Sequence, residues 1–348
     1  SRAERDVPGW RLVNAAEEAY GDALIELRLQ ALDADDGQRL VAHLLAIESL
    51  PPATRAAILD RAEGNPLFVE EIIRMLIDQE AIVLVEGSWI ARSEVVDIEI
   101  PETLHGLLLA RIDRLPAEAG RILRVAGVVG RTFAVRVLDH VGAASLTIPE
   151  GQRGTGRELR LLEGAGLISL AAAASEPEYV FHHALIQDAA YASLLKEERR
   201  SLHARVADAL LDLYPERRED LAPTLAHHFE RAEDRDRSLE YFTLAARHAY
   251  ARFARHEAVD FARRAIAILD DGDVLDPADR RRRAELRLLQ GEAGIDFVPL
   301  SESLPLFDAV IADGESLEDP ELTARAYLAI GGVRALSGEQ YGTSPGLT

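Results

Sequence analysis

The clearest hydrophobic pattern in the chain runs from residue 66 to residue 78. Apolar residues recur there at the spacing of one helix face, at Phe68, Ile72, Met75 and Leu76. Polar residues fall between them and are predicted to turn away from the core, namely Glu70, Glu71, Arg74 and Asp78. The spacing therefore predicts an amphipathic helix over this stretch.

A glycine, an asparagine and a proline stand directly before this helix. Gly64 can close the preceding helix in the left-handed geometry that glycine tolerates. Asn65 can cap the next helix, and Pro66 suits its first position, where a missing N–H needs no partner. A compact junction between two helices explains these residues, and a ligand bound at the turn is the alternative.

Short strand-like patterns flank the two helices. An alternation of apolar residues predicts a strand at Leu24, Ile25, Leu27 and Leu29. Asp33 to Asp36 can start a helix that carries Leu40, Leu44 and Leu45. This pair is typical of the last strand and helix of an α/β core whose beginning is absent. Residues on both sides of Glu86-Gly87-Ser88 predict a β-hairpin, which ends at Pro101.

The next hundred residues follow a different order. Two helices broken at Pro116 are predicted first, then a helix over residues 134–141 and another over about residues 154–163. Two short strands follow at residues 167–172 and 179–183, joined by a polar turn at Ser175 to Pro177. The last three of these helices, followed by a two-stranded wing, give the order of a winged-helix domain.

Beyond residue 200 the pattern predicts helix after helix. Small residues at Ala246, Ala258 and Ala265 stand where one helical hairpin of a tetratricopeptide repeat needs close packing. Later helices near residues 284–293 and 322–336 keep the amphipathic period without that signature, and we interpret them as repeat-like. The predicted fold is mainly α: the end of a P-loop α/β core, a helical lid, a winged helix, and a helical solenoid resembling tetratricopeptide repeats.

Composition excludes several classes of protein. A hydrophobic content of 48% with 28% charged residues is ordinary for a globular protein, and no apolar run approaches the roughly 20 residues of a membrane span. No signal peptide is evident. The chain has no cysteine, which fits a reducing cytoplasm and excludes thiolate metal sites. The net charge of −21 repels nucleic acid overall. The start "SRAERD" and the end "SPGLT" favour a fragment of a longer protein.

Four stretches taken in order carry a family resemblance. The segments "LDRAEGNPLFVEEII", "IPETLHGLLLARIDRL" and "FHHALIQDAAYASLL", followed by the helical array, resemble bacterial STAND-type signalling ATPases. The chain looks most like the ATPase modules beside LuxR-type regulators and class III nucleotide cyclases. In STAND proteins and their AAA+ relatives, a Gly-x-Pro turn of the lid lies over the adenine of bound nucleotide, and Gly64 and Pro66 match that turn.

The resemblance implies two more nucleotide contacts. His183 matches the histidine of the Met-His-Asp motif of eukaryotic relatives, which contacts the β-phosphate of ADP from the winged helix. Ala184 replaces the aspartate of that motif, so the motif is incomplete in this chain. Arg2 matches the arginine at the end of a sensor strand that reads the γ-phosphate, because "SRAE" resembles Thr-Arg-Pro-Glu.

The hydrolytic motifs themselves are absent from these 348 residues. A phosphate-binding loop needs Gly-x4-Gly-Lys-Ser/Thr after a strand. The nearest approach is "GVVGRT" at residues 127–132, which has Val125 for the first glycine, Arg131 for the lysine and a helix before it. The resemblance implies that ATP or ADP, with Mg²⁺, binds a core preceding residue 1, and that the parent protein is a slow ATPase, with a nucleotide cyclase as one possible fusion partner.

Other polar clusters have simpler interpretations. His182 and His183 could bind metal, but adjacent strand residues point to opposite faces and no second ligand cluster is evident. His227 and His228 are predicted to be one packed and one solvated histidine. Arg280 to Arg283, flanked by acidic residues, is typical of a solvated helix face.

These observations combine into one expectation. Residues 1–48 would end a P-loop NTPase core, 49–100 would form a helical lid with a hairpin, 101–200 a winged helix, and 201–348 the repeats. The chain would be part of a cytoplasmic switch that is gated by ATP and ADP and does not bind a membrane. Its repeats would sense a protein or small-molecule inducer, and the switch would self-associate on activation. Two alternatives stay open: a repeat scaffold with no nucleotide role, and a DNA-binding winged helix that uses Arg153, Arg157 and Arg160, which the acidic charge disfavours.

Overall fold

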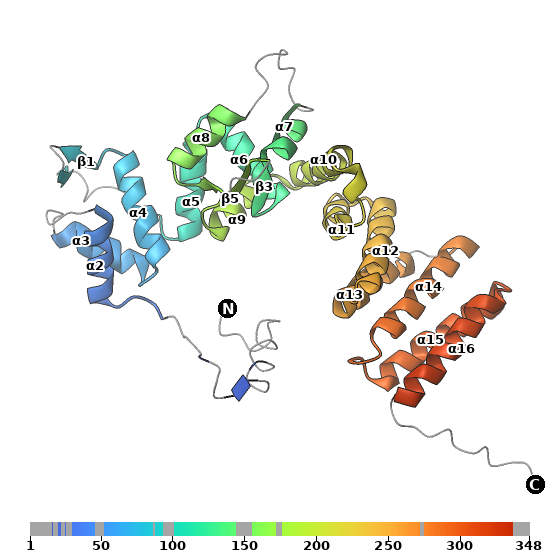
Figure 1. Ribbon diagram of the computed structural model, residues 1–348. Coiled ribbons are helices and arrows are strands. Elements are labelled where there is room, and N and C mark those ends of the chain that lie inside the picture. The colour runs from blue at the N-terminus through green and yellow to red at the C-terminus, as the bar shows by residue number, and fades with distance from the viewer. Residues whose placement is uncertain are drawn as a thin grey trace, which may run out of the picture. The chain divides into compact units, whose positions relative to one another are not determined.

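The computed structural model describes residues 16, 20–21, 25, 30–45, 52–85, 88–92, 101–143, 155–171, 176–271 and 275–336. The chain is mainly helical and divides into two units, residues 1–111 and 112–348, which are described separately (Figure 1). Arg2, the hairpin turn at residues 86–87 and the predicted strand over residues 24–29 apart from Ile25 lie outside the described residues. Ile25 is exposed and belongs to no helix or strand.

The first unit packs helices around one hydrophobic core. Buried side chains of three helices meet there, among them Val41, Ile58, Ile72 and Leu76. The elements are α2 (Ala34–Leu45), α3 (Pro52–Ala62), α4 (Pro66–Asp78), β1 (Ile82–Val85), β2 (Ser88–Ala91) and α5 (Leu104–Asp113), the last of which crosses the boundary between the units. The predicted hairpin is confirmed, because β1 and β2 pair antiparallel with Val83 opposite Ile90.

Helix α4 confirms the apolar stripe and corrects one polar position. Phe68, Ile72, Met75 and Leu76 are all buried. The prediction that Glu71 turns away is wrong, because its side chain is 1% exposed and its Oε2 lies 2.5 Å from Nη1 of Arg111 on α5. Glu70 is partly exposed and pairs with Arg74 one turn later. The stripe is therefore wider than the apolar residues alone indicate.

The second unit begins with helices around a small sheet. Its first elements are α6 (Ala117–Val129), β3 (Thr132–Ala134), α7 (Val135–Ala143), α8 (Gly156–Gly164), β4 (Ile168–Leu170), β5 (Glu178–Phe181) and α9 (Ala184–Ala192). The sheet has the order β3-β5-β4 with both pairs antiparallel. The expected two-stranded wing is thus a three-stranded sheet, since β3 pairs with β5 through Phe133 and Tyr179. Phe133 and Phe181 are buried, with ring centroids 5.5 Å apart.

The rest of the second unit is a stack of helices in which each packs on the next (Figure 1). The elements are α10 (Lys196–Leu213), η3 (Pro215–Arg217), α11 (Ala222–Arg231), α12 (Arg235–Ala251), α13 (Arg255–Asp270), α14 (Pro277–Ala293), α15 (Leu300–Ser316) and α16 (Pro320–Leu336). Ala246, Ala258 and Ala265 are fully buried, as the repeat pattern predicts. A Cβ on Gly291 would come within 2.5 Å of the Phe307 ring, so glycine permits the close approach of α14 and α15.

The same tight turn recurs between helices of the stack. The middle residue of three turns is left-handed although it is not glycine: Glu233 at φ 57°, Phe253 at φ 61° and Glu318 at φ 54°. Each turn reverses the chain within three residues and brings consecutive helices together. These repeated turns make the array a regular helical solenoid.

Candidate functional site

The Gly64-Asn65-Pro66 turn is a hydrogen-bonded helix junction. Gly64 adopts φ 74° and accepts a hydrogen bond from the Leu32 N–H at 2.8 Å. Asn65 Oδ1 accepts from the N–H groups of Leu67 and Phe68 at 3.1 and 3.4 Å, and Pro66 begins α4. A Cβ on residue 64 would come within 2.5 Å of the Leu32 carbonyl oxygen. The chain therefore requires glycine here for its conformation and for its contact with residues 31–32.

A hollow of about 620 Å³ lies beside this turn, within the first unit. Gly64 lines it, whereas Pro66 does not. The other lining residues come from the start of α2, from α3 and from α4, and all but two are apolar or glycine: Leu32, Asp33, Gly37, Ala56, Ala57, Leu59, Asp60 and Val69. Its volume lies in the range of small-molecule sites, and its lining suits a flat apolar ring with a few polar edges.

His183 stands at the start of α9, immediately after the sheet. Its backbone is extended, at φ −133° and ψ 145°, and its carbonyl oxygen accepts from the Ile186 N–H at 3.1 Å. Its imidazole makes no capping hydrogen bond to α9 and is half-buried. The prediction that His182 and His183 point to opposite faces is wrong, because both follow β5 and their rings meet edge to face at 4.8 Å.

The sequence-predicted site residues thus fall into separate parts of the molecule. Gly64 and Pro66 share one turn of the first unit, and His183 belongs to the second. Arg2 lies outside the described residues.

The array carries a wide polar groove of about 790 Å³ between η3, α12 and α14. Charged side chains of both signs line it, and several are paired with each other. Arg247 reaches Glu285 at 2.8 Å, Arg281 reaches the same carboxylate at 3.3 Å, and Arg218 pairs with Glu240. Such a surface presents alternating charges to a polar partner.

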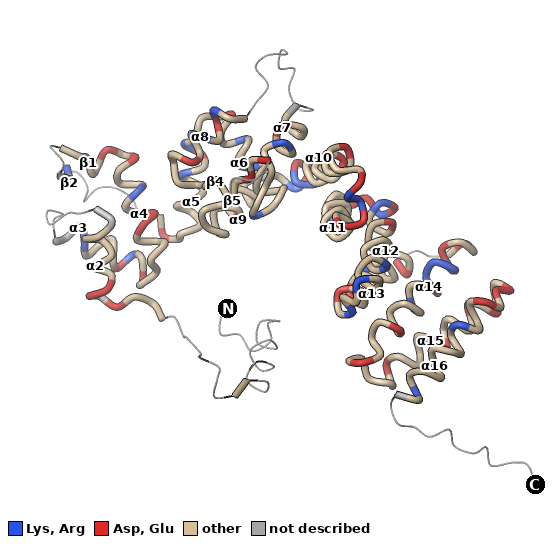
Figure 2. The backbone as a smooth tube through the Cα atoms, in the orientation of Figure 1, with Lys and Arg blue, Asp and Glu red and all other residues tan. Residues whose placement is uncertain are grey.

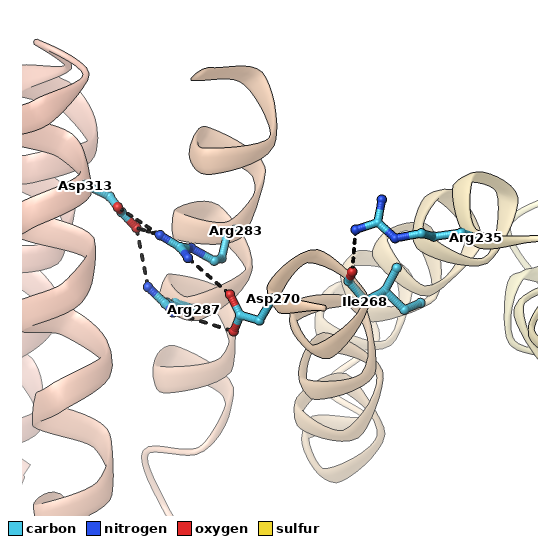
Figure 3. A network of polar contacts seen from close by, with 6 residues as sticks. All are labelled: Arg235, Ile268, Asp270, Arg283, Arg287 and Asp313. Carbon is cyan, nitrogen blue, oxygen red and sulfur yellow. Dashed lines mark hydrogen bonds and ion pairs between the residues drawn. The ribbon is translucent and has the colours of Figure 1, made fainter. Parts of the chain in front are cut away.

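The arginine run at the start of α14 matches its prediction in part, because Arg281 and Arg282 are exposed. This run, the blue stretch at the start of α14 in Figure 2, was expected to be a solvated face. Arg283 is instead 20% exposed and reaches Asp270 of α13 at 3.1 Å and Asp313 of α15 at 3.2 Å, and Arg287 joins the same carboxylates (Figure 3). Arg283 therefore connects three consecutive helices by ion pairs.

The histidine pair on α11 has the predicted division of roles. His228 is buried and His227 is exposed. The pattern gave no reason to single out His203 of α10, which lies 2.8 Å from His228, Nδ1 to Nδ1, and 3.0 Å from the Tyr191 hydroxyl through Nε2. Among the described residues, no three His, Cys, Asp or Glu side chains are grouped so that they could hold a metal ion.

Within the part of the chain that the structure describes, no helix combines the length and the apolar character that crossing a bilayer requires.

Comparisons with known proteins give partial matches. A family model described as a domain of unknown function (DUF8739) matches residues 33–88, the stretch from α2 to the hairpin. An uncharacterized protein of Rhizobium meliloti (strain 1021), R02095, is 25% identical over 286 residues, which cover 78% of this chain and 26% of that protein. The chain thus spans about a quarter of the length of this relative.

The comparison with solved structures matches the STAND (signal transduction ATPase with numerous domains) protein PH0952 of Pyrococcus horikoshii, which has a tetratricopeptide repeat sensor. The TM-score is 0.47 and the sequence identity 12%, over 91% of this chain and 43% of that one.

Proposed function

We propose that this chain is the regulatory part of a nucleotide-gated signalling switch of the STAND type. The observation that carries the proposal is the mostly apolar hollow beside Gly64. The sequence motif of that turn is the one that resembles the adenine-covering turn of STAND and AAA+ lids. The motif and a cavity of suitable size and lining coincide at Gly64, and this coincidence supports adenine binding at the hollow.

The gating follows from the places at which a phosphate-binding core and His183 would contact the nucleotide. ADP, held by a phosphate-binding core, would contact the lid at the hollow and the second unit at His183. ADP would thereby hold the closed state together, and exchange for ATP would release it because ATP makes the His183 contact less well. Residues 101–200 would act as the winged helix of this switch.

The helical array supplies the input surface in this proposal. Stacked helices expose extended faces, and the groove between η3, α12 and α14 offers alternating charges to an inducer or partner protein. Self-association would follow release of the closed state.

The test fills the hollow without disturbing the core. Ala57 is exposed on α3 and lines the hollow, so Ala57→Phe in the complete polypeptide should weaken ADP binding about tenfold or more by occupying the space of the base. Arg61→Phe is the matched control, because Arg61 is exposed on the same helix and does not line the hollow. Calorimetry with ADP measures both. Equal ADP affinity in the two variants contradicts adenine binding at this site.

One observation favours a repeat scaffold with no nucleotide role as the second candidate. The Gly64 carbonyl, the Asn65 N–H and the Asn65 side chain of the turn each already have a hydrogen-bond partner within the chain. A scaffold predicts partner binding that does not respond to ATP or ADP, and the Ala57 experiment separates the two functions.

A further inference from the structure

A third hollow, of about 510 Å³, lies wholly within the second unit. Side chains that recur along one face of α11, from Pro223 to Arg231, form one wall, and a face of α9 with Gln187, Asp188 and Tyr191 forms another. His203 of α10 and the end of α6 at residues 127–130 complete it. We call this hollow the α9–α11 groove. Its volume is that of a small-molecule site.

A hydrogen-bonded chain of three side chains forms part of the lining. The Tyr191 hydroxyl lies 3.0 Å from Nε2 of His203, and Nδ1 of His203 lies 2.8 Å from Nδ1 of His228. Both nitrogens of His203 are therefore engaged, which fixes its ring. Burial lowers the pKa of His203 to about 4 and that of His228 to about 3, so both rings are neutral near pH 7.

The groove lining holds one guanidinium, of Arg231, and one carboxylate, of Asp188, in a chain whose net charge is −21. Arg231 lines it and has no hydrogen bond or ion pair to any described residue, whereas Arg200 and Arg237 on neighbouring helices pair with carboxylates. The Arg199 guanidinium stacks over the Tyr191 ring at 5.2 Å, and its Nε has no hydrogen-bond partner among the described residues. After burial and the neighbouring His227, the positive charges of Arg231 and Arg199 contribute to the lowered pKa of His203.

We propose that the α9–α11 groove binds a small molecule through a doubly charged tetrahedral oxyanion, a phosphate ester, which Arg231 and His227 hold. A guanidinium can donate two parallel hydrogen bonds to such a group, and His227 stands one turn earlier on the same face of α11. This site lies apart from the hollow beside Gly64 and does not depend on nucleotide gating.

Binding of the oxyanion should take up a proton. The charged and titratable groups that face the groove, or lie beside those that do, are Asp188, Tyr191, Arg199, His203, His227, His228, Glu230 and Arg231. Asp188 is the only carboxylate in the lining, and Glu230 is paired with Arg264. A bound dianion favours the protonated form of the nearby imidazoles, so affinity should rise as the pH falls from about 8 to about 6.

Sulfate is the probe, because its charge does not change over this pH range. The full chain is titrated with sulfate at constant ionic strength, and histidine side-chain NMR signals report occupancy. Sulfate should bind saturably, and several-fold more tightly at about pH 6 than at about pH 8. Arg231→Gln should weaken it about tenfold or more, whereas Arg263→Gln, at an exposed position on α13 outside the groove, should change it less than about twofold.

Further arms separate the sources of the signal. Phenyl phosphate should bind at least as tightly as sulfate, and acetate much more weakly. Circular dichroism verifies that Arg231→Gln is folded. His227→Gln should lessen the pH dependence of the affinity for sulfate. Non-saturable binding, equal losses in the Arg231 and Arg263 variants, or equal affinity for acetate and sulfate would each overturn the proposal.

Discussion

The two buried histidines should make the second unit less stable as the solution becomes mildly acidic. His203 and His228 are each 2% exposed, and burial is the main reason that their pKa values lie near 4 and 3. In the unfolded chain an imidazole takes up a proton below about pH 6.5. Between these values the unfolded state binds more protons than the folded state, so stability present above pH 6.5 is lost as the pH falls towards about 4.

The size of the loss follows from the same values. At about pH 5.5, one unit below the unfolded pKa, each histidine costs about 1.4 kcal/mol relative to neutral pH, because the folded ring remains neutral. The pair should therefore lower the free energy of unfolding by about 2 to 3 kcal/mol between about pH 7.5 and about pH 5.5. His228→Asn keeps a polar atom near Nδ1 and removes one titrating group, so it should roughly halve this difference.

Urea unfolding followed by far-UV circular dichroism measures the second unit, which holds most of the helices. Both tryptophans, Trp10 and Trp89, lie in the first unit, so their fluorescence follows that unit separately. His256→Asn is the matched control, since His256 is exposed on α13 and its loss should leave the wild-type pH dependence in place. A pH dependence that is the same in His228→Asn as in the wild type would refute the reasoning.

Two further predictions concern the two units separately. Glu71→Gln should destabilise the first unit by about 2 to 3 kcal/mol, because it weakens a buried ion pair with Arg111. Glu70→Gln removes a partly exposed ion pair within one helix and should cost less than about 0.5 kcal/mol. Unfolding followed by tryptophan fluorescence measures both variants, and equal losses of stability would contradict this prediction. Removal of residues 277–348 from the complete polypeptide should leave α6 to α13 folded, as measured by circular dichroism, and should leave the affinity for ADP unchanged, because each repeat contacts only its neighbours. Loss of ADP binding would show that the array contributes to nucleotide binding as well as to sensing an inducer.

Local patterns predicted the helices and their ends. The apolar spacing of α4, the capping by Asn65 and the break at Pro116 depend on residues within one or two turns, and each is present in the structure. Close packing at Ala246 and Ala258 was also predictable, because small residues at repeat spacing have few other roles.

Contacts between distant residues were not predictable from those patterns. Glu71 is buried because Arg111, 40 residues later, supplies its charge partner. The three residues of β3 are too few to show alternation, and they form a strand because β5 offers an edge. Arg283 reaches Asp313, 30 residues later, and His203 reaches His228, 25 residues later. A single charged or aromatic residue carries no signal of a partner that the fold brings to it.

The rate of ADP release from the complete polypeptide tests nucleotide gating most directly. His183→Ala is compared with His182→Ala, its exposed neighbour, whose ring contacts it. A hydrogen bond from His183 to a charged phosphate is worth roughly 1.5 to 3 kcal/mol, so its loss should speed ADP release about ten- to a hundredfold with a nearly unchanged melting temperature and little effect on ATP. His182→Ala should release ADP at the wild-type rate. A lowered melting temperature in His183→Ala with unaltered ADP release would contradict the proposed switch.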